Sequence, residues 1–353
     1  MTDPFGVYVH VPFCAHRCDY CAFATWTDRA HLVDEYLAAV RTEIAVAVDD
    51  GMPVAASVFV GGGTPSLVPP DALAAVIRSV PVVPGAEVTV ECNPDDVTRD
   101  LIATYAEAGV DRVSIGVQSM VPHVLTALGR THDVDNVERA VAAVRSVGLR
   151  TFNLDLIYGT VGESAADWRT TLLRALDLEP PHVSAYGLTV EPGTPLAADP
   201  ARHPDDDTQA DEYELADDLL TAAGLDNYEV SNWARPGHEC RHNHLYWGQH
   251  DYRGFGCAAH SHRAGRRWWN IRTPERYLEA VAAGRSPEAA AETLDDDARR
   301  IEGLQLSLRT RAGVPAGALD GEALPGLVEC QDDRWVLTRR GRLMANEVAV
   351  RLR

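Results

Sequence analysis

The sequence predicts an α/β fold, in which a partial (β/α)6 barrel of the TIM type is followed by a small α+β domain. Short β-rich runs alternate with amphipathic helical stretches through about the first 225 residues of the 353-residue chain. The β-rich runs are mostly apolar and β-branched, as expected for strands buried on both faces. Six β/α units are two fewer than a closed eight-stranded barrel has, so we expect an open side that admits a large ligand or partner.

The expected elements follow one another in regular order. The strands are expected at residues 6–11, 57–61, 87–91, 112–117, 151–157 and 182–188. The helices are expected at residues 31–48, 71–80, 98–108, 134–147 and 167–178. Gly109 and Gly148 indicate two helix C-termini, because glycine adopts the left-handed conformation with which many helices end.

The composition of the sequence changes between about residues 228 and 274, a segment that contains much of the chain's His, Trp and Tyr. We therefore divide the chain into a barrel over residues 1–228, a connecting segment with a candidate site over 229–290, and a C-terminal winged-helix-like domain over 291–353. The last two parts hold an expected helix at 274–283, an acidic linker at 295–297, a helix through Leu308, and a hairpin leading into a helix after residue 338. Acidic residues interrupt the basic surface of this domain, so a packing or partner role is expected.

Composition excludes several classes of function. The chain has 32 basic and 52 acidic residues, a formal net charge of −20, and no lysine at all. It therefore lacks a Schiff-base lysine, a P-loop lysine and a kinase-type lysine. The acidic excess repels phosphate backbones, so we expect no nucleic-acid partner. We find no apolar run of the roughly 20 residues that a membrane-spanning helix needs, nor a signal peptide, and we expect a cytoplasmic protein.

Three of the seven cysteines lie close together after the first expected strand, as Cys14-x3-Cys18-x2-Cys21. Loops at the carboxyl ends of barrel strands carry the active sites of this architecture. An iron–sulfur cube usually takes four cysteines, so three would leave one iron open for an exogenous ligand. The alternative is a Cys3His zinc site completed by His10 or His16, for which this spacing is atypical.

The C-x3-C-x2-C pattern, with Tyr20 before the last cysteine, resembles the signature of radical S-adenosylmethionine proteins. The resemblance implies a [4Fe-4S] cluster with three cysteine ligands and S-adenosylmethionine on the open iron. Residues 61–65, Gly-Gly-Gly-Thr-Pro, resemble the family's GGGTP loop, although a glycine triplet alone indicates only a tight turn. Gly62, Gly63 and Thr64 are then expected to contact the methionine end, because no Cβ keeps the backbone away.

Five further residues resemble the S-adenosylmethionine ligands of the branch related to oxygen-independent coproporphyrinogen III oxidase. Each alone would more often be an ordinary polar residue at a barrel rim. They are Tyr8, Glu91, Gln118, Arg130 and Asp155. By charge, Glu91 and Asp155 suit hydroxyl, amino or sulfonium groups, and Arg130 suits a carboxylate.

Two departures from the oxidase pattern indicate the HemW group of haem chaperones, which resembles the oxidase in fold but lacks its decarboxylating activity. The oxidase carries a further cysteine two residues after the third, where this chain has Phe23. It also has a substantial N-terminal extension, whereas 13 residues precede Cys14 here. The positive signature is residues 242–247, which contain the HNxxYW pattern of that group.

The HNxxYW resemblance implies a haem site. His242 is the candidate axial ligand of the iron, and Tyr246 and Trp247 can stack on the macrocycle. A histidine beside aromatic residues is more often packed and hydrogen-bonded than a ligand, so other histidines stay open as ligands: His238, His244, His260 and His262. Arg263, Arg266 and Arg267 can pair with haem propionates, although solvation is the usual state of surface arginines, and Cys257 is a weaker thiolate alternative.

The resemblance implies a protein that binds haem and delivers it to recipient respiratory haem proteins, without coproporphyrinogen oxidase activity. It also implies transient contact with membranes, and it leaves open a haem donor protein and a homodimer. The alternative is a radical enzyme, either the decarboxylating oxidase or a related methyltransferase. Phe23, the short N-terminus and the HNxxYW pattern favour the haem chaperone.

Overall fold

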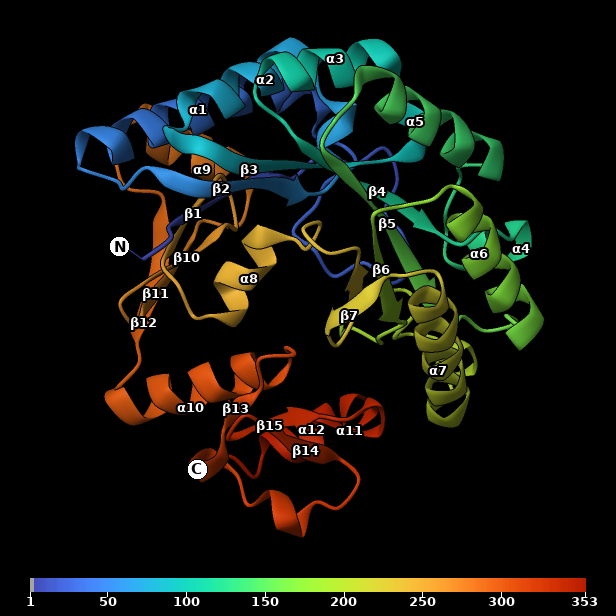
Figure 1. The fold of residues 1–353 in the computed structure, drawn as a ribbon. Coiled ribbons are helices and arrows are strands. Elements are labelled where there is room, and N and C mark those ends of the chain that lie inside the picture. The colour runs from blue at the N-terminus through green and yellow to red at the C-terminus, as the bar shows by residue number, and fades with distance from the viewer. Residues whose placement is uncertain (1–2) are drawn as a thin grey trace.

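The computed structural model describes residues 3–353 and is built on a 12-stranded sheet, with a three-stranded sheet in the C-terminal domain (Figure 1). Six parallel strands form the centre of the large sheet in sequence order, and each pairs with the next. They are β1 (Gly6–Val11), β2 (Ala55–Gly62), β3 (Val82–Cys92), β4 (Arg112–Gln118), β5 (Thr151–Tyr158) and β6 (His182–Gly187). The predicted α/β class and the partial barrel are confirmed.

Helices cover the outer, convex face of this sheet (Figure 1). They are α1 (Val33–Asp49), α2 (Pro70–Ser79), α3 (Arg99–Glu107), α4 (Pro122–Ala127), α5 (Val134–Val147), α6 (Ala165–Asp177) and α7 (Asp206–Ala222). Short 3-10 helices lie at Ala30–Leu32, Pro65–Leu67, Pro94–Asp96, Pro200–Arg202, Ala316–Ala318 and Gly321–Ala323. Sequence analysis did not identify α4 or α7.

The central strands are buried on both faces, as expected, but the two faces differ in chemistry. Successive side chains of a strand point to opposite faces. In β1, Val7, Val9 and Val11 are fully buried in the core under the helices. Polar and aromatic side chains of β1, β4 and β5 line the interior of the barrel instead: Tyr8, His10, Arg112, Ser114, Asn153 and Asp155.

Residues 226–293 extend the sheet at both edges. At one edge lie β7 (Asp226–Glu229) and β8 (Asn232–Ala234), which pairs antiparallel with β6. At the other edge β9 (Tyr252–Phe255) pairs parallel with β1 and is followed by β10 (His260–Arg263), β11 (Arg266–Asn270) and β12 (Glu288–Thr293). Helix α8 (Arg241–Trp247) lies on the concave side of the sheet, and α9 (Pro274–Ala282) contacts α1.

The C-terminal domain has its own small core. It comprises α10 (Asp296–Leu308), β13 (Val314–Pro315), β14 (Val328–Gln331), β15 (Arg334–Leu337), α11 (Arg339–Leu343) and α12 (Ala345–Ala349). The expected hairpin is present, but the expected final helix is divided into two short helices at Met344. The expected acidic linker is the start of α10, because the Asp295 side chain accepts the Ala298 N–H and caps the helix.

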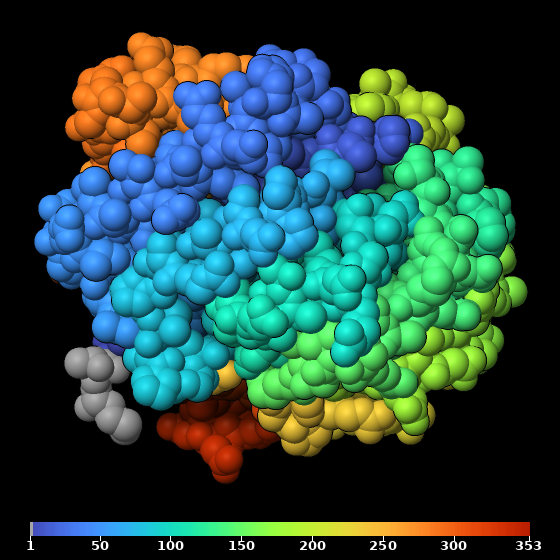
Figure 2. Space-filling view, turned by 90° about the horizontal axis from the view of Figure 1, so that it is seen from above, coloured from blue at the N-terminus to red at the C-terminus, as the bar shows by residue number. Residues whose placement is uncertain are grey.

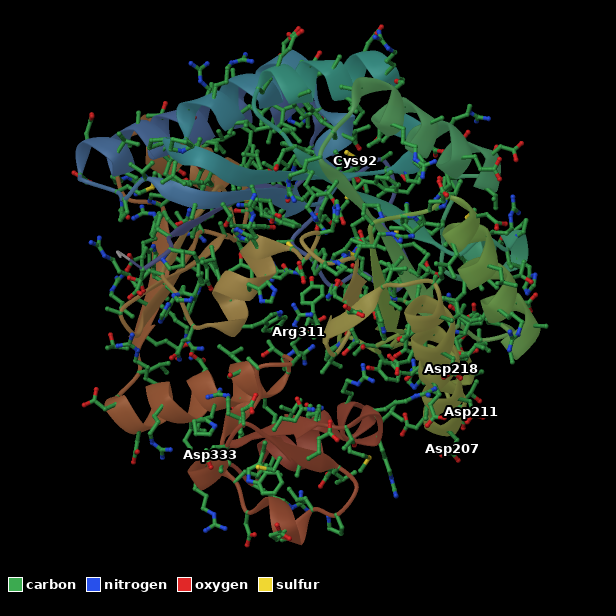
Figure 3. All side chains as sticks on the ribbon, in the orientation of Figure 1. Cys92, Asp207, Asp211, Asp218, Arg311 and Asp333 are labelled. Atoms are coloured by element: carbon green, nitrogen blue, oxygen red, sulfur yellow. The ribbon has the colours of Figure 1, made fainter. Side chains whose placement is uncertain are left out.

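Ion pairs join the C-terminal domain to the barrel and to the connecting segment. Arg339 pairs with Asp218 of α7 at 2.8 Å, and Arg311 pairs with Glu239 at 2.9 Å; Figure 3 labels Asp218 and Arg311. Seen from above in Figure 2, the helices cover the barrel and the C-terminal domain projects at one edge. Among residues 3–353, none of the helices combines the length and the apolar character needed to cross a membrane.

Candidate functional site: two adjoining cavities

The cysteine loop leaves β1 and lines a cavity of about 670 Å³. Cys14, Cys18 and Cys21 are free, half-buried thiols. The Cys14 N–H donates to Trp26 O at 3.1 Å, and His10 Nε2 bonds Ala24 O at 2.9 Å, so both ends of the loop are tied to neighbouring backbone. Within residues 3–353, no three His, Cys, Asp or Glu side chains are assembled as a metal site, so the thiols would have to converge on a cluster.

The glycine loop after β2 packs directly against the cysteine loop. Gly62 has a φ of +116°, and a Cβ there would lie 2.4 Å from the His10 ring. A Cβ on Gly63 would lie 2.6 Å from Phe13 O and 3.0 Å from Cys14 Sγ. The Thr64 hydroxyl lies 3.6 Å from the same sulfur. These positions need glycine to leave room beside the thiol, which fits the cluster and ligand that the sequence motifs imply.

Three residues expected as cofactor ligands reach the same cavity from β3, β4 and β5: Glu91, Gln118 and Asp155. The register of β4 against β5 shifts between Gly116 and Gln118, and Gln118 adopts a φ of +64°. This local distortion turns the end of β4 at the rim of the cavity. Cys92, labelled in Figure 3, follows Glu91 but is buried, and its thiol is directed at Val90 O.

Arg130 links this cavity to the cysteine loop. Its guanidinium donates to Asn93 Oδ1 at 2.8 Å and to Gly116 O at 3.0 Å, and it lies 3.6 Å from Cys18 Sγ. A fixed cation beside the cavity can hold a ligand carboxylate without reorganising.

Two carboxyl groups share the boundary between this cavity and a second one. Burial raises the pKa of Glu91 to about 7, with a further contribution from Asp155, against the hydrogen bond that Glu91 accepts from Gly62 N–H at 3.0 Å. Burial also raises the pKa of Asp155, although its carboxylate accepts hydrogen bonds from Ser114 at 2.7 Å and Asn153 at 2.8 Å. Both groups suit a cationic or hydrogen-bond-donating ligand.

The second cavity, of about 520 Å³, lies in the barrel interior. It shares lining residues with the first cavity, among them Phe23, Gly62, Glu91 and Asp155. Tyr8 lines this second cavity, with its hydroxyl 3.0 Å from His10 Nδ1. Of the expected cofactor residues, Tyr8 is therefore separated from the cysteine-lined cavity that holds Gln118 and Arg130.

Helix α8 brings three of the four HNxxYW residues to the second cavity, His242, Asn243 and Tyr246. His242 is 1% exposed, and both ring nitrogens are engaged: Nδ1 with the Ser57 hydroxyl at 2.8 Å and Nε2 with the Tyr246 hydroxyl at 2.9 Å. Its ring also stacks on Phe59, with centroids 5.4 Å apart. Ligation of iron by His242 would require one of these hydrogen bonds to break.

Trp247 lies elsewhere, with the Arg309 guanidinium 4.8 Å above its ring. It is therefore not brought to the cavity with His242 and Tyr246.

The alternative haem ligands differ in the hydrogen bonding of their ring nitrogens and in the exposure of their rings. Both ring nitrogens of His262 are hydrogen-bonded, and His238 bonds Thr151 at 2.9 Å. His244 packs beside Tyr228, with ring centroids 5.1 Å apart. His260 lines the second cavity, is exposed, and stacks on Trp269 with centroids 5.7 Å apart. Among these histidines, His260 combines access to the cavity with an exposed ring.

The thiol and two of the three arginines expected near haem are engaged by other protein groups. Cys257 is buried beside the Tyr36 hydroxyl. Arg266 pairs with Glu288, and Arg267 with Glu292 at 2.9 Å and with Glu302. Arg263 is exposed.

Sequence analysis missed several polar residues of the second cavity: Arg112, Asn153, Ser184, Tyr186, Asn232 and Arg272. Four of them lie in expected strands, and their alternation with apolar residues was an available signal. Arg112 was the clearest such signal, because it is a charged residue at the first position of a strand that is otherwise buried.

Comparisons with known proteins agree on one family. Residues 8–175 match the sequence model described as the Radical SAM superfamily. Three relatives are each named "Heme chaperone HemW". The protein of Mycobacterium tuberculosis (strain CDC 1551 / Oshkosh) is 43% identical, over 98% of this chain and 94% of its own length. That of Escherichia coli (strain K12) is 35% identical, over 98% and 97%. That of Bacillus subtilis (strain 168) is 32% identical, over 97% of each.

A solved structure supports the fold. Coproporphyrinogen III oxidase (HemN) from Escherichia coli, described as a radical SAM enzyme, superposes with a TM-score of 0.86. It is 22% identical, over 98% of this chain and 89% of its own. At this identity the likeness shows a shared fold.

Proposed function

Because the chain belongs to the HemW family of the radical SAM superfamily, we propose that it binds haem and delivers it to recipient haem proteins. The observation that carries the proposal is the pair of adjoining cavities. One is lined by the three thiols and the glycine loop, and the other by the HNxxYW residues His242 and Tyr246. A macrocycle in the second cavity would lie beside whatever the first cavity holds.

The first cavity is proposed to hold a [4Fe-4S] cluster on Cys14, Cys18 and Cys21, with S-adenosylmethionine beside it. When bound, such a cluster can supply an electron to the sulfonium. The chain's part is to bind and orient: Arg130 offers a cation to the carboxylate, and the glycine loop gives close access to backbone. The proposed S-adenosylmethionine contacts are Gly62, Gly63, Thr64, Glu91, Gln118, Arg130 and Asp155 in the first cavity, and Tyr8 in the adjoining second cavity.

The second cavity is proposed to hold haem, which here is cargo. Its volume is within the range of about 300–1,000 Å³ that is usual for ligand sites. Tyr246, Tyr8 and Phe59 offer aromatic surface to a macrocycle. His242 is the motif's candidate ligand, and His260 at the same cavity is the alternative with the more accessible ring.

Absence of coproporphyrinogen oxidase activity is proposed from the residue that replaces the oxidase's additional cysteine. Phe23 is 62% exposed and lines both cavities. It offers an apolar surface to a macrocycle but no thiol. The alternative function, a radical enzyme acting on a porphyrinogen or another substrate, uses the same two cavities and is favoured by the fold of the oxidase.

The test is a spectroscopic titration of the anaerobically reconstituted full chain with haem. We expect saturable, stoichiometric binding. Variants H242A and H260A are compared with H123A, whose histidine is exposed on α4. Loss of affinity in one of the first two, with the iron content of the cluster unchanged, identifies the ligand. No haem binding by the wild-type chain would refute the proposal.

A parallel turnover assay separates the two functions. Reduced protein given S-adenosylmethionine and coproporphyrinogen III should form no protoporphyrinogen, and turnover would favour the oxidase. We further propose a cytoplasmic location, respiratory haem proteins as recipients with transient membrane contact, a haem donor and a homodimer. Haem transfer to membrane vesicles that contain apo-respiratory enzymes, and sedimentation of the purified chain, test these partners.

A further inference from the structure

Arg112 is a buried cation in the wall of the second cavity. It is the first residue of β4, only 2% exposed, and on the polar inner face of the barrel. Its Nε is buried without a hydrogen-bond partner. No carboxylate within residues 3–353 lies within the 4.0 Å of an ion pair with it.

The carboxylates whose charge acts on Arg112, Glu87 and Asp155, are also engaged by other residues. Glu87 pairs with Arg150 at 3.0 Å and accepts the His242 backbone N–H at 3.2 Å. Asp155 accepts hydrogen bonds from Ser114 and Asn153. Arg112 therefore has no acidic partner to itself.

The rest of the surrounding wall is rich in neutral polar groups. Ser114, Asn153, Ser184, Asn232 and Asn243 line the same cavity. Asn232 is 2% exposed, and its Oδ1 is a second buried atom without a partner. A buried donor of Arg112 and a buried acceptor of Asn232 thus both lack hydrogen-bond partners, and both residues line one cavity.

A buried charge without a partner is strongly unfavourable, and native proteins pair such charges. The guanidinium has a fork of N–H donors that matches a carboxylate in a bidentate arrangement. The cavity supplies the room for that carboxylate.

We propose that Arg112 binds a carboxylate of the ligand that occupies the second cavity. The inference rests on the proposed function, in which the ligand is haem and the carboxylate is a propionate. It offers a propionate partner in place of Arg266 and Arg267, which are already paired with glutamates.

The test compares haemin with its dimethyl ester, in which both propionates are blocked. A hydrogen bond to a charged group corresponds to a factor of about 10–100 in affinity. The wild-type chain should prefer the free acid by about this factor, and R112M should lose the preference. R263M, which changes an exposed arginine of β10, should keep it.

The outcomes test the inference separately from the proposed function. Equal affinity of the wild-type chain for haemin and its ester overturns the inference and leaves haem binding intact. If R263M and not R112M loses the preference, the propionate site lies on β10, and the inference is again wrong.

Stability of the ligand-free protein gives a second readout. Burying a charge without a partner is costly, so an apolar side chain of similar length in its place should not lower the stability. We expect R112M to unfold at the same temperature as the wild type or higher. A marked decrease in the unfolding temperature would assign Arg112 a structural role and overturn the inference. This readout needs no ligand, so it tests the inference even if the wild-type chain binds no haem and the proposed function has failed.

Discussion

Gly63 approaches Cys14 so closely that a Cβ on the glycine would lie 3.0 Å from the cysteine sulfur. The same Cβ would lie 2.6 Å from Phe13 O and 2.9 Å from Val11 O. Backbone atoms at these distances cannot move aside as a flexible side chain can. The glycine loop therefore fixes the start of the cysteine loop, and the two motifs act as one structural unit although Gly63 lies 49 positions after Cys14 in the sequence.

We predict that G63A lowers the iron and sulfide content of the reconstituted protein. The added methyl group must displace Phe13 O and the Cys14 thiol, so the three cysteines should no longer converge. The control is G317A, because a Cβ at Gly317 meets nothing within 4 Å. Iron content equal to that of the wild type in G63A would show that the loop adapts.

Each of the single variants C14S, C18S and C21S should abolish the brown iron–sulfur absorption after anaerobic reconstitution, because a hydroxyl replaces a thiolate ligand. The matched control is C330S, which changes an exposed free thiol in the C-terminal domain. We expect C330S to retain the colour. A wild-type protein that is colourless and holds one zinc ion would instead support the Cys3His zinc alternative.

The parts of the fold that depend on local pattern could be predicted from the sequence. Strand β1 and helix α5 have the expected bounds, because alternation and periodicity are carried by neighbouring residues. Helix α7 was missed because acidic residues dominate it. The pairing of β9 with β1 was not predictable, since it joins segments about 240 residues apart and neither segment encodes its partner.

The candidate site shows the same division. The cysteines and the glycine loop could be named from compact motifs. The environment of His242 could not, because Ser57, which bonds its ring, is 185 residues away in the sequence. Arg112 was read only as part of a strand, because the polar inner face becomes evident only when the strands are placed side by side.

His242 should contribute to stability whether or not it binds haem. H242A removes two buried hydrogen bonds, to Ser57 and Tyr246, and leaves both hydroxyls without this partner. We expect the free energy of unfolding of ligand-free protein to fall by roughly 2–5 kcal/mol. Chemical denaturation measures this, with H123A, an exposed change on α4, as the control. Unchanged stability would show that the imidazole is not held as described.

Glu163 predicts a pH dependence of stability. Burial raises the pKa of its carboxyl from 4.5 to about 8, and Glu212 and Asp167 add to the shift, although Thr160 N–H donates to it at 3.2 Å. Because the folded state holds the proton more tightly, the unfolded state is favoured as the pH rises from 4.5 to about 8. The variant E163Q removes this penalty. The difference in free energy of unfolding between E163Q and the wild type should therefore be near zero below pH 4.5 and should increase to roughly 2–5 kcal/mol above about pH 8. Denaturant titrations across this range measure the difference, with E35Q, an exposed change on α1, as the control. A flat difference for E163Q would mean that the pKa of Glu163 is the same in the folded and the unfolded protein.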